Sequence, residues 1–211
     1  MTGEKVKVWD VGVRIFHWSL VILFFVSYFT GEEENLLHIY AGYGVLGLIA
    51  FRIVWGFVGT KHAKFSDFIY GPKTIFQYVK MLFTAKPDRY LGHNPLAGWM
   101  VIALLICLIG VSWSGLELYA DEGRGPLANQ QYSITAPVMA NDDKKEHDND
   151  SEDKHENEEA GDFWEDIHET FANLTLLLVF IHIIGALTAS TIHRENLIKA
   201  MITGYKSTTK H

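Results

Sequence analysis

The sequence predicts an all-α protein whose four helices cross a membrane as a bundle. Four windows are almost purely apolar: Ile15 to Thr30, Leu36 to Gly59, Pro95 to Leu116 and Thr170 to Ile192. Each approaches the ~20 residues needed to cross a hydrocarbon layer about 30 Å thick. Backbone polar groups have no water to bond in lipid, so such segments form helices rather than open strands. Charged stretches between the windows exclude one long hydrophobic core.

We place the transmembrane helices at about residues 11–30, 36–59, 95–116 and 168–192 of a single domain that covers 1–211. The first connection is short and acidic, so the first two helices should form an antiparallel hairpin. The second is long and basic, and Pro72 opens a segment in which lysines alternate with apolar residues, which indicates a helix on the inner membrane surface. After the last span, Leu197, Met201 and Tyr205 recur at steps of four, which predicts a second surface helix.

The third connection, residues 117–163, includes the acidic run "NDDKKEHDNDSEDKHENEEAGD". A segment with so little apolar content cannot bury enough surface to order itself, so we expect a disordered periplasmic insert. It could attract a basic partner, or bind metal ions through His147 and His155. It could equally be a solvated linker without a target.

Basic residues set the expected orientation of the bundle. With the N-terminus inside, the outer side receives only Arg124, Lys144, Lys145 and Lys154, and all other lysines and arginines outside the spans fall on the inner side. The positive-inside rule therefore places both termini of this multi-pass membrane protein in the cytoplasm. No cleavage site follows the first helix, which we expect to be retained as an anchor. No nucleic-acid partner is expected.

Four histidines lie within or beside the predicted spans: His17, His38, His168 and His182. His182 follows His168 by fourteen residues, a helical rise of roughly 21 Å and almost four full turns, so the two rings share one face at two depths. The topology puts His38 and His168 at the outer face. It puts His17 and His182 toward the inner face.

Ionisable groups inside a bilayer are costly and often mark a cofactor, a proton path or a partner. One such histidine alone would suit a hydrogen-bonded structural role, but four of them favour a cofactor. Imidazoles from facing helices can supply both axial ligands of a haem iron. We therefore predict two haem b groups, ligated by the pairs His17/His182 and His38/His168, with no catalytic side chain. The single cysteine, Cys107, excludes an internal disulfide and a CxxCH attachment site, so the haems should be held non-covalently.

The inner pair poses a problem of depth. Counted from the ends of their helices, His182 lies ~15 Å deep, whereas His17 is only ~5 Å beyond Arg14. The two rings become level if the first helix begins nearer Trp9, or if the fourth helix is tilted.

Arg52 follows His38 by fourteen residues and has no Asp or Glu within the spans. It could bind a propionate of the inner haem, or its side chain could snorkel to the inner interface. Glycines near the histidines could have either of two roles: they could make room for the face of a haem, or they could allow the helices to pack closely. They are Gly42, Gly44, Gly47, Gly110 and Gly185.

Several segments resemble the bacterial cytochrome b561 and nickel-iron hydrogenase b-type cytochrome family: "RIFHW", "HIYAGYGVLGLIAFRIVWG", "GHNPLAGWM" and "HIIGA…HRENLIKAMITG". The resemblance covers nearly the whole chain apart from residues 117–163. It implies a four-helix membrane protein with two b-type haems that exchanges electrons between the quinone pool and a partner protein. It also implies His17, His38, His168 and His182 as ligands. The acidic insert is absent from the shortest members of the family.

We therefore expect an electron-transfer subunit of a respiratory chain, acting as a quinol or quinone oxidoreductase with quinone as its substrate. Its partner would be a periplasmic cytochrome c or a hydrogenase subunit. The alternative is a divalent-metal transporter that uses the intramembrane histidines as relay sites and the acidic loop as a collector. The spans contain no Asp or Glu, which a transport path normally includes.

Overall fold

The computed structural model describes residues 5–31, 35–83, 90–121, 123–128 and 152–207. Within them the elements follow in the order β1 (Lys5–Lys7), α1 (Val11–Phe29), α2 (Leu36–Val58), a 3-10 turn (Lys61–Ala63), α3 (Phe65–Phe68), α4 (Pro72–Phe83), α5 (Pro95–Asp121), α6 (Glu152–Ile192), α7 (Leu197–Thr203) and β2 (Tyr205–Ser207). Four of the helices, α1, α2, α5 and the Gly161–Ile192 part of α6, are long and apolar enough to cross a membrane. The predicted all-α transmembrane bundle is confirmed.

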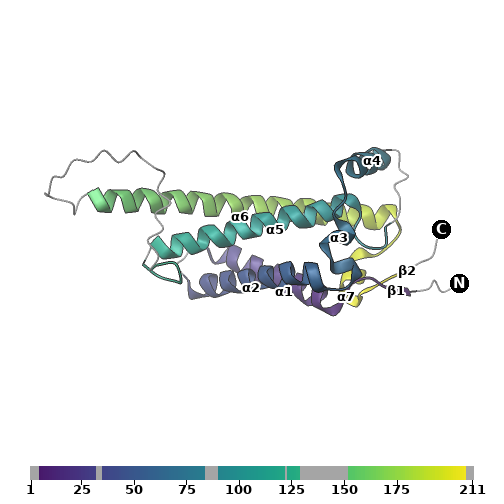
Figure 1. Cartoon of the computed structure of the whole chain (residues 1–211), viewed down its shortest axis with the longest axis horizontal. Helices are drawn as coiled ribbons and strands as arrows, with labels where there is room; N and C mark the ends of the chain where they lie inside the picture. Colours follow the sequence, from purple (N-terminus) through teal and green to yellow (C-terminus); the bar gives the residue numbers. More distant parts are fainter. Residues whose placement is uncertain (1–4, 32–34, 84–89, 122, 129–151, 208–211) are drawn as a thin grey trace.

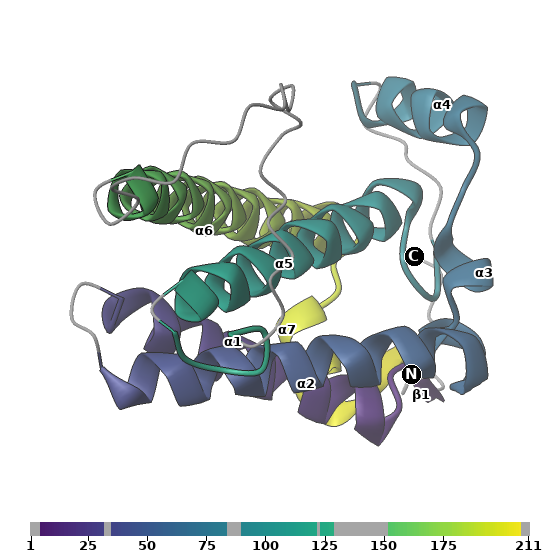
Figure 2. The same ribbon diagram turned by 60° about the vertical axis from the view of Figure 1, so that its left-hand side comes forward.

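The bundle consists of two helical hairpins laid against each other. Helix α1 packs along α2, α5 packs along α6, and fewer contacts join α2 to α5 (Figures 1 and 2). Phe24 of α1, Val45 and Ile49 of α2, and Leu108 of α5 form the buried centre. Many other large apolar side chains are exposed, among them Phe57 at 69%. A lipid-facing surface has this composition because hydrocarbon solvates apolar side chains as well as a protein interior does.

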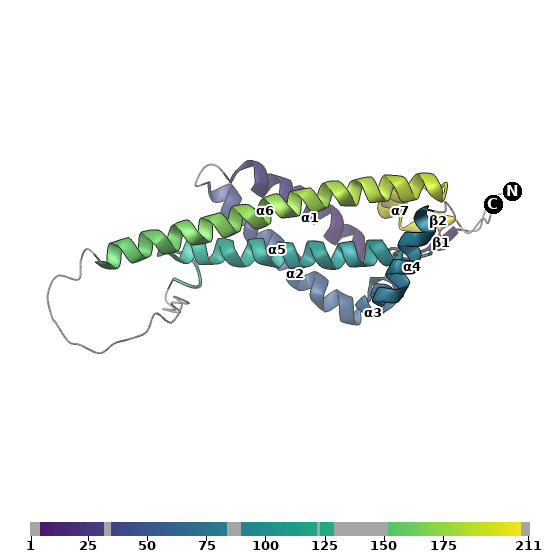
Figure 3. The same cartoon turned by 90° about the horizontal axis from the view of Figure 1, so that it is seen from above.

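Both ends of the chain meet at one end of the bundle (Figure 3). Strands β1 and β2 pair antiparallel, with Lys5 opposite Ser207 and Lys7 opposite Tyr205. Gly204, at φ 87°, ends α7 in the left-handed conformation, which glycine adopts without steric cost. Tyr205 therefore lies in a strand, and the predicted surface helix ends two residues earlier, at Thr203. The pairing places both termini on one side of the membrane, and a cytoplasmic location for that side stays a prediction.

The helices extend further than the sequence predicts on either side of the acidic insert. Helix α5 continues to Asp121, and α6 begins at Glu152 rather than near His168. The predicted disordered insert is thus helical at both of its ends. A helix that continues from a membrane span already has its nucleus, so it can add turns without burying apolar surface of its own. The middle of the insert, residues 129–151, lies outside the described residues.

Asp10 joins the start of α1 to the end of α2. Its carboxylate accepts a hydrogen bond from the backbone N–H of Val13 at 2.8 Å, and thereby caps α1. It also accepts from Trp55 Nε1 at 3.1 Å and from the hydroxyl of Thr60. Burial opposes ionisation of Asp10, but the hydrogen bonds from Thr60, Val13 and Trp55 outweigh it and hold the pKa of the carboxyl below its usual range.

We expect Asp10→Ala to lower the free energy of unfolding by about 1–2 kcal/mol, because a helix cap and two further hydrogen bonds are lost. Thermal unfolding in detergent, followed by circular dichroism, measures the change. Because the folded-state pKa is depressed, the stabilisation is full above the unfolded-state pKa and is lost as the pH falls through the folded-state pKa. Asp162→Ala, an exposed carboxylate, is the control. Equal melting temperatures for the two variants would contradict the assigned role of Asp10.

Candidate functional site

The structure brings His38 of α2 and His168 of α6 together at the end of the bundle opposite the chain termini, which is the outer end under the predicted topology. Their ring centroids are 6.0 Å apart. His38 Nδ1 lies 2.9 Å from the carbonyl oxygen of Ser27, and His168 Nδ1 lies 3.0 Å from that of Val111. A carbonyl can only accept, so each Nδ1 carries the proton and donates it. Each Nε2 is then left with a lone pair that is available to a metal.

A cavity of about 120 Å³, partly open to its surroundings, is lined by both rings and by residues of α1 and α5. Its walls are mainly apolar and include Phe24, Tyr28, Gly42, Val45 and Leu108. Apolar walls exclude water and would hold a flat, largely apolar group. The cavity thus has the surroundings that a haem requires.

The structure also brings together His17 of α1 and His182 of α6, with ring centroids 6.5 Å apart. The two rings are close together although His17 lies six residues, about 9 Å, from the start of α1 at Val11 and His182 lies ten residues, about 15 Å, from the end of α6 at Ile192. His17 Nδ1 is buried and has no hydrogen-bond partner among the described residues. In this respect the inner pair differs from the outer pair.

Both pairs fit the dimensions of a bis-histidine iron site. An iron about 2 Å from each ring nitrogen, the length of other metal–imidazole bonds, separates the two ring centroids by about 6 Å. The observed separations of 6.0 and 6.5 Å agree with this value. The described residues contain no group of three or more His, Cys, Asp or Glu side chains that could hold a metal ion by themselves. His147 lies outside the described residues, as does the side chain of His155.

Arg52 is 3% exposed and lies beneath α3. Its guanidinium carbon is 4.9 Å from the ring centroid of Phe65 and 5.7 Å from that of Phe68. Its Nη1 atom is buried without a hydrogen-bond partner in the described part of the chain. The side chain therefore points into the protein. It does not snorkel to the inner interface, which was one of the two predicted positions.

The glycines divide into two groups. A Cβ atom at Gly44 would lie 2.7 Å from Leu23, and one at Gly110 would lie 2.7 Å from Phe171, so these two glycines allow close helix packing. A Cβ at Gly42, Gly47 or Gly185 would meet no atom within 4 Å. Of these three, Gly42 lines the outer cavity, where the absence of a side chain leaves room for a ligand.

The sequence analysis missed Gly115 and His93. A Cβ at Gly115 would lie 2.9 Å from His168 Cε1, so only glycine lets that ring take its position. His93 directly precedes the cap of α5, where Asn94 accepts from the N–H of Ala97. Its ring centroid lies 4.6 Å from that of Trp9 and 4.7 Å from that of Phe68. Its place just before the Asn-Pro start of α5 was the available signal.

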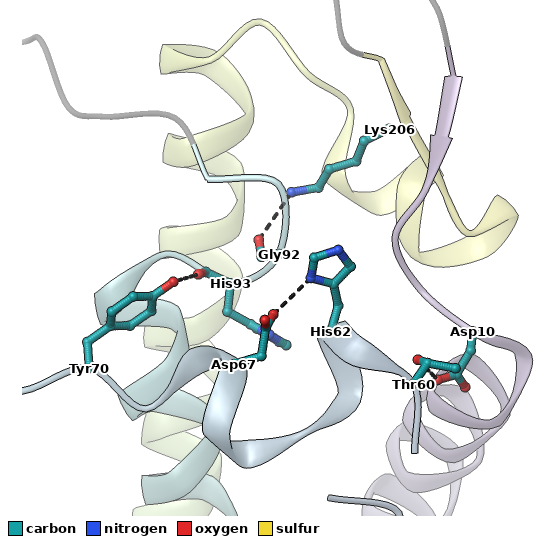
Figure 4. A network of polar contacts seen from close by, with 8 residues as sticks. All are labelled: Asp10, Thr60, His62, Asp67, Tyr70, Gly92, His93 and Lys206. Carbon is teal, nitrogen blue, oxygen red and sulfur yellow. Dashed lines mark hydrogen bonds and ion pairs between the residues drawn. The ribbon is translucent and has the colours of Figure 1, made fainter. Parts of the chain in front are cut away.

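Polar contacts hold the turn that carries His93 (Figure 4). The hydroxyl of Tyr70 donates to the carbonyl of His93, and Lys206 Nζ donates to the carbonyl of Gly92, each at 3.4 Å. Nearby, His62 Nδ1 and Asp67 Oδ2 pair at 2.8 Å. Burial, followed by the positive charges of Arg52 and Lys206, lowers the pKa of His93 to about 3. The His93 ring is therefore neutral near pH 7.

Comparison with known proteins decides the family. The model of the prokaryotic cytochrome b561 family matches residues 8–204, which is nearly the whole chain. The chain belongs to this family. As a b-type cytochrome it binds haem b, and its activity is electron transfer in a membrane. This assignment favours electron transfer over divalent-metal transport.

The chain is also similar to individual members of the family. It is 27% identical to the probable Ni/Fe-hydrogenase B-type cytochrome subunit of Azotobacter chroococcum mcd 1, over 95% of this chain and 88% of that protein. It is 23% identical to the protein of the same name from Cupriavidus necator, over 98% and 90% of the two chains. The probable Ni/Fe-hydrogenase 1 B-type cytochrome subunit of Escherichia coli K12 is 27% identical over 62% and 64%. No solved structure matches the chain significantly.

We expect Gly115→Val to impair haem binding at the outer pair alone, because the added side chain would displace His168 and enter the cavity. Haem content per chain should fall from about two toward one, as measured by the pyridine haemochrome assay. Gly71→Val, at an exposed glycine with nothing within 4 Å of its Cβ position, should keep its full haem content. Full haem content in Gly115→Val would show that His168 tolerates displacement.

Proposed function

We propose that the protein carries electrons across the membrane between the quinone pool and a periplasmic hydrogenase, through two haem b groups. The two histidine pairs, with centroid separations of 6.0 and 6.5 Å at two depths of one bundle, carry this proposal. His38 and His168 ligate the outer haem, and His17 and His182 ligate the inner haem. Each haem, when bound, supplies an iron that takes up and releases one electron.

The protein's own groups hold and orient these ligands. The carbonyls of Ser27 and Val111 fix the tautomers of His38 and His168, and the hydroxyl of Ser114 lies 3.2 Å from His168 Nδ1. Such bonds fix the ring orientation and raise the basicity of the coordinating nitrogen. The apolar cavity walls exclude water from the outer site. Little reorganisation is then required when the charge on the iron changes.

The hydrogenase partner is inferred from the relatives. Proteins similar to this chain over 95% and 98% of its length are named probable Ni/Fe-hydrogenase B-type cytochrome subunits. Under the predicted topology, the outer haem pair and the acidic insert face the periplasm, where such a partner would dock. The inner pair lies at the other end of α6, and quinone would exchange electrons with the bundle from the lipid.

Four single substitutions test the pairing of the ligands. His38→Ala and His168→Ala should each lose or alter the outer haem, and His17→Ala and His182→Ala should each do so at the inner haem. Haem content should fall from about two toward one per chain, because one axial ligand of one site is removed. Redox titration and electron paramagnetic resonance should sort the four variants into two matched classes.

Some of these variants can fail to accumulate, because a cofactor that binds only the folded state stabilises it. For such positions, His→Met keeps a potential axial ligand and shifts the potential of one haem. Four variants that all retain two bis-histidine haems would overturn the ligand assignment. A class containing His17 with His38 would overturn the pairing.

The acidic residues from Asp142 to Asp162 predict electrostatic steering of a basic partner. We expect deletion of residues 141–160 to leave the haem spectrum intact and to slow electron exchange with the partner. The slowing should diminish as salt rises, because charges are screened over ~8 Å at physiological ionic strength. Stopped-flow kinetics over a range of salt concentrations measures it. An unchanged rate and salt dependence would leave the insert as a linker.

A further inference from the structure

Unpartnered buried nitrogen atoms gather at the end of the bundle where the termini lie. Among the described residues, the buried side-chain polar atoms without a hydrogen-bond partner are Arg14 Nε, His17 Nδ1, Ser27 Oγ, Arg52 Nη1 and His93 Nδ1. Four of the five are nitrogens, and they belong to residues at the inner end. A buried polar group without a partner destabilises the folded state, and a buried charged group does so more strongly. Because these unpaired nitrogens lie at the same end of the bundle, they indicate a site that binds a hydrogen-bond acceptor.

Arg52 is 3% exposed, and His93 is half-buried with its Nδ1 atom enclosed. They come from α2 and from the turn before α5, and both contact the fully buried ring of Phe68, at 5.7 and 4.7 Å. The charge of Arg52 contributes to lowering the pKa of His93, as expected for groups that lie close together. No described aspartate is hydrogen-bonded to either residue: Asp10 attracts the Arg52 charge, but its carboxylate accepts from Val13, Trp55 and Thr60, and Asp67 pairs with His62.

We propose that Arg52 and His93 together bind a propionate carboxylate of the inner haem, with His93 Nδ1 as a hydrogen-bond donor beside the Arg52 charge. This inference rests on the proposed function, since it requires a haem at the His17/His182 pair. Phe16 and Phe51, the sequence neighbours of His17 and Arg52, have ring centroids 6.5 Å apart, so Arg52 lies close to the inner ligand pair. A carboxylate is the acceptor that an arginine and an N–H donor match best.

The surroundings of His93 suit a residue that positions a ligand. Its ring is enclosed by Trp9 and Phe68, and the carbonyls of Gly92 and His93 accept from Lys206 and Tyr70 (Figure 4). Lys206 belongs to β2, so the pairing of the chain ends helps to close the inner site over His93. The imidazole can then aim its N–H without loss of side-chain entropy on binding.

The test compares His93→Phe, which keeps a ring between Trp9 and Phe68, with His93→Asn, which keeps an N–H close to the position of Nδ1. A redox titration should show a lower midpoint potential for the inner haem in His93→Phe and a value near the wild type in His93→Asn. The reason is that a less neutralised carboxylate favours the oxidised iron. The inner haem should dissociate about tenfold faster from His93→Phe, the scale of one hydrogen bond to a charged group. The outer haem and the control His193→Phe should keep their potentials.

Reconstitution with haem dimethyl ester identifies the source of the carboxylate. With both propionates esterified, the difference between wild type and His93→Phe should vanish. If His93→Phe does not accumulate, Arg52→Gln takes its place in the same comparison. A shift that persists with the ester would assign the carboxylate to a lipid or another anion, and would overturn the proposal.

An unmoved inner potential in His93→Phe would also overturn it. This result is distinguishable from failure of the proposed function. Two bis-histidine haems that keep the predicted pairing would leave the electron-transfer role standing while removing His93 from the inner site. If the four alanine variants do not sort into the predicted ligand pairs, both the proposed function and the role of His93 would be overturned.

Discussion

A polar group buried in a dry interior must find a partner, and this constraint shapes the molecule at every level. It makes the apolar windows helical, because only a helix satisfies its own backbone in lipid. It explains the caps at Asp10, Asn35 and Asn196, whose side chains bond the N–H groups that a helix start leaves unpaired. It also governs the histidines, whose ring nitrogens cannot lie inside the bundle without acceptors, protons or metal.

The two ends of the bundle meet this constraint differently. At the outer end, His38 and His168 each direct Nδ1 to a backbone carbonyl, so the protein satisfies that nitrogen by itself. At the inner end, His17, Arg52 and His93 keep nitrogens that no described residue satisfies. The outer ring nitrogens are therefore held by the polypeptide alone, although the hydroxyl oxygen of Ser27 in the same cavity wall has no partner among the described residues. In the proposed assignment, the bound ligand supplies the acceptor for the unpaired groups of the inner site.

Much of this architecture follows from the sequence, because hydropathy and the fourteen-residue spacing of His168 and His182 are local signals. The closeness of His17 to His182 could not be settled in this way, since it depends on how α1 and α6, which are remote in sequence, are placed relative to each other. The pairing of β1 with β2 is also invisible in the sequence, because it joins two strands of three residues from opposite ends of the chain. His93 was overlooked for a related reason. Its burial depends on Trp9 and Phe68, which are remote in sequence, and not on its neighbours.

The proposed ligation also explains how two hairpins become one bundle. Helix α1 packs against α2 and α5 against α6, but direct contacts between the hairpins are fewer. Each histidine pair joins one helix of the first hairpin to α6 of the second: His17 from α1 to His182, and His38 from α2 to His168. Two iron sites across this boundary, at two depths, would hold the hairpins at a fixed separation and rotation. The cofactors would then be structural ties as well as electron carriers, because the contacts that the hairpins lack are those that a ligated group between them supplies.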